Sequence, residues 1–297
     1  MNKLLFLFYL LLVLLFIFGI IYSILFFKDK FENINENIPK VIYLTHKEKI
    51  PQFVIDNWKN LNPDYQIKFY NDEDCRNFIK NNYPQKFLDY FNMLSQNKGA
   101  GPIKCDFWRC LILHKHGGVY ADSDIELLKP IKFFLEPDTD FLTCNSLYNN
   151  SLNPHLIISR ANNIILEKCI NIYVNEKFNL PYKYWDHSIV NIMAKVFKLL
   201  NIEHTIETTN INYKYMNNNK LLNYKIQLLQ EKIPFGLSTD ASLIGSVFIK
   251  KAYCSYKNIK VLHNRYSEYN SSTHNYKKIK KVDKNIFNFY KLIFTKI

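Results

Sequence analysis

The stretch that decides the fold is Gly117-Gly118-Val119-Tyr120-Ala121-Asp122-Ser123-Asp124-Ile125, a glycine pair followed by a short apolar run and two aspartates. The apolar run predicts a buried strand, and side chains alternate between the two faces of a strand. Asp122 and Asp124 are therefore expected on the same side, with Ser123 pointing away. In α/β sheets the carboxyl ends of the strands border the ligand cleft, so we expect both carboxylates to reach a cleft.

Two carboxylates at the end of a buried strand indicate a cation site. They repel each other, and only a cation or a proton relieves that cost. Oxygen ligands favour Mg²⁺ or Mn²⁺ over zinc. The alternative is a solvated turn, because Asp-x-Asp triplets are common by chance.

A helix is expected directly before the glycine pair. Pro102 to His116 carries apolar residues at helical spacing, and Gly117 stands where a glycine commonly ends a helix. Asp106 and Arg109 are three residues apart and so lie on one face of this helix. They form either a surface ion pair or part of the site that the two aspartates begin.

The segment from Lys104 to Asp124, KCDFWRCLILHKHGGVYADSD, resembles the central signature of the sugar-nucleotide glycosyltransferases of family 32, which carry a DXD motif. In that pattern an Asp and an Arg one helical turn apart precede Gly-Gly-x-Tyr-x-Asp-x-Asp. The resemblance implies an α/β fold of GT-A type, with a single Rossmann-like mixed sheet and helices on both faces. It also implies a retaining hexosyltransferase that moves a sugar from a UDP- or GDP-sugar to a glycan, glycoprotein or glycolipid.

The same resemblance implies roles for four residues. Asp124 is expected to bind Mn²⁺ or Mg²⁺ at the leaving nucleotide, and Asp122 to bind the cation or hold the ribose and sugar hydroxyls. Arg109 is expected to neutralise phosphate or fix a sugar hydroxyl, and Asp106 to accept hydrogen bonds from the sugar.

The start of the chain extends the resemblance. Strand and helix patterns alternate at 38–45, 51–60 and 65–70, with a helix cap at 71–74. By resemblance, Tyr43, Thr45 and His46 are the candidates for nucleotide binding. Tyr43 and His46 replace the His and Trp that are usual in the family, so the contacts to the base of the nucleotide are expected to differ. His46 is alternatively a simple loop histidine.

The second half of the chain gives weaker signals. We expect strands at 141–144, 156–159 and 261–266, and helices at 163–178 and 186–200. Tyr213 to Gln227, rich in Asn, Tyr and Lys, is expected to be an insertion or a mobile loop. In related folds a histidine near the place of His263 can complete the metal shell, and imidazole suits Mn²⁺. A buried or capping histidine is the alternative.

Leu4 to Phe27 is free of charged residues and long enough to cross a membrane, since a helix rises about 1.5 Å per residue and the hydrocarbon core is about 30 Å thick. No cleavage site follows, so we expect an uncleaved signal anchor. The flanking lysines leave its orientation open. The resemblance favours a single-pass type II protein with a lumenal catalytic domain in a Golgi- or ER-like membrane.

Four parts of the chain are therefore expected. They are the anchor with its flanks at 1–30, a linker at 31–37, the GT-A catalytic domain at 38–272 and a basic helix or tail at 273–297.

The net charge of +13 comes from lysines spread along the sequence without a nucleic-acid-binding motif, so we expect no nucleic-acid partner. The six cysteines show no Cys-x-x-Cys spacing, so zinc is not expected.

Other classes of protein fit less well. Glycosidases place their two acids about 5 to 10 Å apart across a bond, usually on separate elements. An aspartyl-phosphate phosphatase needs Thr or Val where this chain has Glu126. The remaining alternative is a membrane-anchored, catalytically inactive protein that binds carbohydrate or nucleotide sugar, and turnover of a sugar nucleotide would exclude it.

Overall fold

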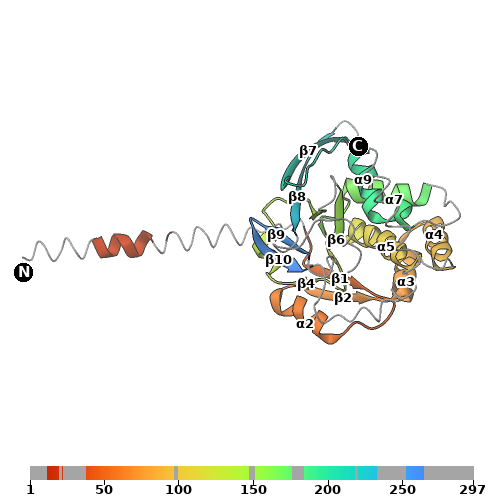
Figure 1. The fold of residues 1–297 in the computed structure, drawn as a ribbon, viewed down its shortest axis with the longest axis horizontal. Coiled ribbons are helices and arrows are strands. Elements are labelled where there is room, and N and C mark those ends of the chain that lie inside the picture. Colours follow the sequence, from red (N-terminus) through yellow and green to blue (C-terminus); the bar gives the residue numbers. More distant parts are fainter. Residues whose placement is uncertain are drawn as a thin grey trace, which may run out of the picture.

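The computed structural model describes residues 12–19, 22, 38–96, 100–146, 151–175, 184–217, 220–232 and 252–263. Their strands form one mixed sheet in the order β2-β1-β3-β6-β5-β8-β9-β10-β4, with β7 paired to β8 (Figure 1). The strands are β1 (Val41–Thr45), β2 (Gln66–Tyr70), β3 (Gly118–Asp122), β4 (Glu126–Leu127), β5 (Phe141–Asn145), β6 (Leu152–Ser159), β7 (Asn210–Asn217), β8 (Lys220–Lys232), β9 (Tyr253–Tyr256) and β10 (Ile259–His263).

Helices cover both faces of this sheet, as expected for the α/β class. The labelled helices are α2 (Gln52–Leu61), α3 (Asp72–Asn82), α4 (Gln85–Gln96), α5 (Gly101–His116), α6 (Ile131–Phe134), α7 (Ile164–Asn175), α8 (Tyr184–His187) and α9 (Ile189–Leu199). One core cluster lies between the sheet and α3, α4, α5, α7 and α9, and the other lies between the sheet and α2 and α6. The predicted mixed sheet with helices on both faces is confirmed.

The register of the parallel strands positions the site. β1 pairs in parallel with β3, and Thr45 stands opposite Asp122. β1 also pairs in parallel with β2, where Thr45 stands opposite Tyr70. Because parallel strands end at the same edge, the last residues of these three strands lie side by side.

Helix α5 is the central helix of the larger core. Every residue from Asp106 to Leu113 is buried, which leaves little of the helix facing solvent. Its predicted C-terminal glycine is confirmed, because Gly117 has a φ of 67° and donates its backbone N–H to the Leu113 carbonyl. The helix therefore ends at Gly117, directly before β3 begins.

The described residues between Tyr213 and Gln227 form strands, so the expectation of a mobile loop was wrong for them. They lie in the β7–β8 hairpin, and β8 also pairs in parallel with β5. Tyr224, Ile226 and Leu228 alternate toward the larger core. Lys214, Asn223 and Lys225 occupy intervening positions, and this composition hid the period of two.

The helix expected at 186–200 is divided. Helix α8 ends at His187, and α9 begins at Ile189 with Ser188 as its N-cap residue. The cap expected at 71–74 is confirmed: the Asn71 side chain accepts from the backbone N–H of Asp74, and the Asp74 carboxylate accepts from that of Asn71.

The N-terminal region is described only in part. Residues 12–19 form a helix whose large apolar side chains are 45% to 71% exposed. Within the described ranges, no helix is both long enough and apolar enough to cross a membrane. The rest of Leu4–Phe27, the linker at 31–37 and the basic segment at 273–297 lie outside the described residues.

The glycine pair has a steric reason. Gly117 and Gly118 both have positive φ, 67° and 105°. A Cβ on Gly118 would stand 2.8 Å from the Val41 carbonyl oxygen, and a Cβ on Gly117 would stand 2.7 Å from the Ala161 nitrogen. Only glycine lets the chain pass from α5 into β3 at this distance from its neighbours.

Replacing Gly118 by alanine is expected to lower the free energy of unfolding by about 2 to 4 kcal/mol, because the new Cβ meets backbone and the φ is strained. Gly101→Ala is the matched control. Gly101 lies at the start of α5, and nothing stands within 4 Å of its added Cβ. Urea unfolding should show no loss of stability in the control; equal losses in both variants would contradict the steric explanation.

Candidate active site

The centre of the candidate site is the guanidinium group of Arg109. Its Nη2 atom lies 2.8 Å from Oδ1 of Asp106 and 3.0 Å from Oδ1 of Asp122. Its Nη1 atom donates to the carbonyl of Pro154 at 2.7 Å. We call these four residues the arginine clamp, because one buried side chain joins α5, β3 and β6.

Tyr120 completes the contacts of Asp122. Its hydroxyl donates to Oδ1 of Asp122 at 2.9 Å, and its ring lies under the guanidinium carbon of Arg109, 4.3 Å from the ring centroid. Burial raises the pKa of Tyr120 well above its usual range, so the hydroxyl remains a donor. Sequence reasoning did not include Tyr120 in the site, although its position two residues before Asp122 puts both on one face of β3.

Asp106 points inward. It is 2% exposed, and its second oxygen, Oδ2, accepts the backbone N–H of Ile189 at 3.0 Å. That N–H belongs to the first turn of α9, where no residue of the helix itself can accept it. Burial raises the pKa of Asp106 to about 6, although Arg109 and the Ile189 N–H act in the opposite direction. The alternative of a surface ion pair between Asp106 and Arg109 is excluded.

The guanidinium group of Arg109 remains protonated although it is buried. Burial lowers its pKa, but Asp122, Tyr120 and Asp106 more than offset this, so the pKa lies well above its usual range. Arg109 is 5% exposed and both of its terminal nitrogens have partners within the protein. This geometry favours a role in holding Asp122 over direct contact with a phosphate.

The two aspartates do not share a strand. β3 ends at Asp122, and the backbone N–H of Ile125 returns to the Asp122 carbonyl at 3.1 Å, which closes a turn. Asp124 lies in this turn, so the expectation based on strand alternation was wrong for Asp124. Ser123 is buried between the two half-buried acids. Both aspartates still lie at the carboxyl edge of the sheet.

Asp122 retains one oxygen for a ligand. Its side chain is 34% exposed, and both of its contacts go to Oδ1. Oδ2 has no partner in the part of the chain that the structure describes. A half-exposed carboxylate beside a second one in the following turn is a donor set that suits Mg²⁺ or Mn²⁺. These residues therefore fit the cation that the sequence predicts.

His263 lies near the strand that follows this turn. At the end of β10 it stands opposite Glu126 of β4, and its Nδ1 atom lies 2.9 Å from Oε2 of Glu126. Among the described residues, its ligand atoms do not form a compact group with those of Asp122 and Asp124. Its predicted place in the metal shell stays a prediction.

The three candidates for nucleotide binding lie at different depths. Thr45 stands level with Asp122 and donates to the Tyr70 carbonyl at 2.8 Å. His46 follows it and is partly exposed; its Nδ1 atom accepts the backbone N–H of Glu48 at 3.1 Å. Tyr43 is 3% exposed and packs in the larger core. Thr45 and His46 thus share an edge with Asp122, whereas Tyr43 lies beneath them.

The comparisons with known proteins point to one family. Residues 49–155 match the family described as "Glycosyltransferase sugar-binding region containing DXD motif". The chain is 34% identical over 99 residues to inositol phosphoceramide mannosyltransferase 3 of Schizosaccharomyces pombe, a match that covers 32% of this chain and 26% of the relative. It is 27% identical over 127 residues to the initiation-specific alpha-1,6-mannosyltransferase of Saccharomyces cerevisiae, covering 35% of this chain and 26% of the relative.

The chain thus spans about a quarter of the length of these curated relatives. Among solved structures, the PaToxG glycosyltransferase aligns with 55% of this chain and 69% of its own, at 16% identity and a TM-score of 0.44. The family match contains the whole arginine clamp and both aspartates of the turn. The resemblance inferred from Lys104 to Asp124 is therefore confirmed: residues 49–155, which include that segment, match the glycosyltransferases that contain a DXD motif.

Proposed function

We propose that this chain is a metal-dependent, retaining hexosyltransferase of GT-A type that uses a UDP- or GDP-sugar and a glycan, glycoprotein or glycolipid acceptor. The observation that carries the proposal is the arginine clamp, which fixes Oδ1 of Asp122 and leaves Oδ2 for a ligand. Two relatives are named mannosyltransferases, so mannose is the first donor sugar to test.

The arginine clamp suits sugar transfer because it fixes the carboxylate of Asp122 through one oxygen and leaves the other oxygen available to a ligand. Arg109 and Tyr120 both donate to one oxygen of Asp122, so the plane of the carboxylate is held before any substrate binds. Preorganised groups of this kind lower a barrier because they need not reorganise during the reaction. Asp106 contributes indirectly, by neutralising Arg109 and tying it to the start of α9.

Asp122 and Asp124 are the residues that we assign to a divalent cation. When bound, such a cation supplies positive charge for the nucleoside diphosphate that leaves the sugar. Thr45 and His46 lie at the end of the neighbouring strand, which supports their assignment to nucleotide binding. Tyr43 supports this strand from the core.

We further infer that residues 4–27 anchor the enzyme in a membrane, with the catalytic domain on the lumenal side. The segment carries no charge, and its described part, 12–19, is a helix that exposes large apolar side chains. Burying such a surface in lipid is favourable. An inactive binding protein is the alternative, and turnover separates the two.

Asp124→Asn is expected to lower kcat/KM for sugar-nucleotide turnover by about 100-fold or more, because a neutral amide binds a divalent cation poorly. The variant is expected to remain folded, because asparagine has nearly the same size and shape as aspartate. Turnover of UDP- and GDP-sugars is measured with Mn²⁺ and with a chelator. Asp89→Asn, on an exposed position of α4, is the matched control. Full activity of Asp124→Asn in the presence of chelator would refute the assignment.

Asp106 gives the enzyme a specific pH dependence. Its pKa of about 6 in the folded protein exceeds the usual value of 3.8. The folded state therefore binds more protons between about pH 4 and 6, so the contribution of Asp106 to the free energy of unfolding falls as the pH rises through this window. The clamp needs the ionised carboxylate, so activity is expected to rise over the same window.

Asp106→Asn is expected to remove both trends. The difference in free energy of unfolding between wild type and variant should change by roughly 1 to 3 kcal/mol from pH 4 to pH 7, with the wild type relatively more stable at low pH. The acidic limb of the kcat/KM profile should disappear in the variant. Urea unfolding and turnover are measured at each pH, and parallel profiles for the two proteins would show that Asp106 does not titrate there.

A further inference from the structure

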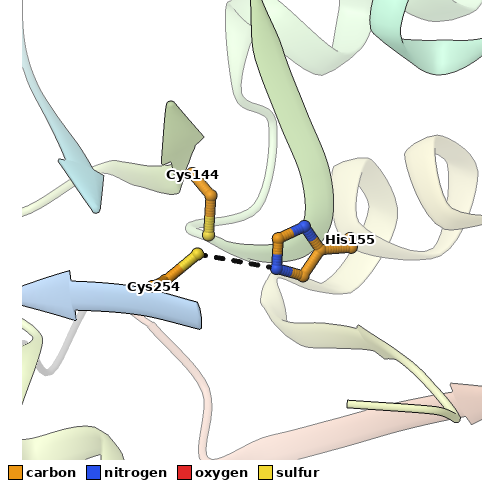
Figure 2. A group of neighbouring side chains, drawn as sticks. All are labelled: Cys144, His155 and Cys254. Carbon is orange, nitrogen blue, oxygen red and sulfur yellow. Dashed lines mark hydrogen bonds between the residues drawn. The ribbon is translucent and has the colours of Figure 1, made fainter. Parts of the chain in front are cut away.

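Three buried side chains outside the arginine clamp gather the atoms that soft metals prefer. Cys144 lies on β5, His155 on β6 and Cys254 on β9, and the three converge on one point in Figure 2. The two sulfur atoms and a ring nitrogen of His155 all lie within 4.8 Å of one another. All three residues are buried. We call them the Cys-His-Cys cluster.

We propose that the Cys-His-Cys cluster is a structural zinc site. Zn–S bonds of about 2.3 Å and Zn–N bonds of about 2.0 to 2.1 Å at tetrahedral angles place a sulfur and a nitrogen ligand about 3.6 Å apart. The Sγ atom of Cys254 lies 3.7 Å from Nε2 of His155. These two side chains therefore stand at the separation that zinc requires.

The ligand types select the metal. Thiolates and imidazole suit zinc, whereas Mg²⁺ and Mn²⁺ prefer the oxygen ligands found at the carboxyl edge of the sheet. Ligation through Nε2 leaves the proton of His155 on Nδ1, which is buried without a hydrogen-bond partner among the described residues. The fourth ligand is a water, because the carboxylate of Glu231, which stands opposite Cys254, accepts from Asn153 and is not part of the compact group.

A metal at this place would fasten β9 to β5 and β6, which lie about a hundred residues earlier in the sequence. β9 pairs with β10, and β10 pairs with β4, which directly follows the turn that holds Asp124. β6 supplies the Pro154 carbonyl to Arg109, one residue before His155. The zinc would therefore stabilise the frame around the proposed transfer site without being part of it.

Sequence spacing does not indicate this site, because its three ligands lie on separate strands and not on one local turn. Zinc was not expected, since the six cysteines show no Cys-x-x-Cys spacing. That rule detects ligands on one local turn. Here the sheet brings together ligands from three separate strands, which spacing alone does not report.

The chain offers a matched control. Cys110 and Cys169 are also fully buried. Within the described ranges they do not belong to a three-ligand group. Replacing Cys169 removes a buried thiol without touching the Cys-His-Cys cluster.

The test is zinc binding by the full chain, purified with a reductant after removal of metal by a chelator. We expect about one zinc per chain by elemental analysis, with a rise in Tm that Mg²⁺ does not reproduce. Cys144→Ser, Cys254→Ser and His155→Gln should each weaken zinc binding by about tenfold or more, whereas Cys169→Ser should bind zinc as the wild type does. Cobalt in place of zinc should show a thiolate charge-transfer band in the wild type.

Three results would overturn the proposal. They are absence of zinc binding by the reduced wild type, unchanged binding by all three cluster variants, or a Cys144–Cys254 disulfide whose reduction does not yield zinc binding. If a serine variant does not fold, the cobalt spectrum of the wild type decides. None of these measurements uses a sugar nucleotide, so they stand or fall separately from the proposed transfer activity.

Discussion

A positive charge buried at the meeting point of three elements sets the geometry of this molecule. Arg109 has almost no contact with solvent, so its charge must be balanced inside the protein. Asp106 and Asp122 supply that balance from α5 and β3, and the Pro154 carbonyl adds a third contact from β6. Removing one partner of a buried ion pair typically costs about 3 to 5 kcal/mol, so the three elements are held in one arrangement.

The position of Arg109 between these elements also constrains the backbone between α5 and β3. For Asp122 to reach Arg109, β3 must follow α5 at once and lie against β1. The chain makes this passage at Gly117 and Gly118, where side chains would collide with the backbone of Val41 and Ala161. The glycine pair and the buried arginine are thus two parts of one constraint, which explains why a single stretch of sequence is so informative about the fold.

The sequence predicted features that depend on local pattern. The helix before the glycine pair and the cap at Asn71 follow from spacing and composition, the mixed sheet follows from the family resemblance, and the structure confirms all three. It could not predict features that depend on what another segment supplies. The composition of the β7–β8 hairpin is that of a loop, but β8 also pairs in parallel with β5, which extends the sheet through the hairpin. Likewise, the turn at Asp124 joins β3 to β4, and β4 pairs with β10, a strand far along the chain.

The two proposed metal sites differ in a way that ordinary ligand chemistry explains. A catalytic cation must exchange with substrate, so its acids belong at an exposed edge, and Asp122 retains a partly exposed carboxylate there. A structural cation gains from exclusion of water and from ligands that tie separate strands together, as the proposed ligands Cys144, His155 and Cys254 would. Because oxygen ligands lie in one place and sulfur and nitrogen ligands in the other, each site disfavours the metal of the other. A single sheet can therefore hold a hard cation at its edge and a soft one in its interior without competition between them.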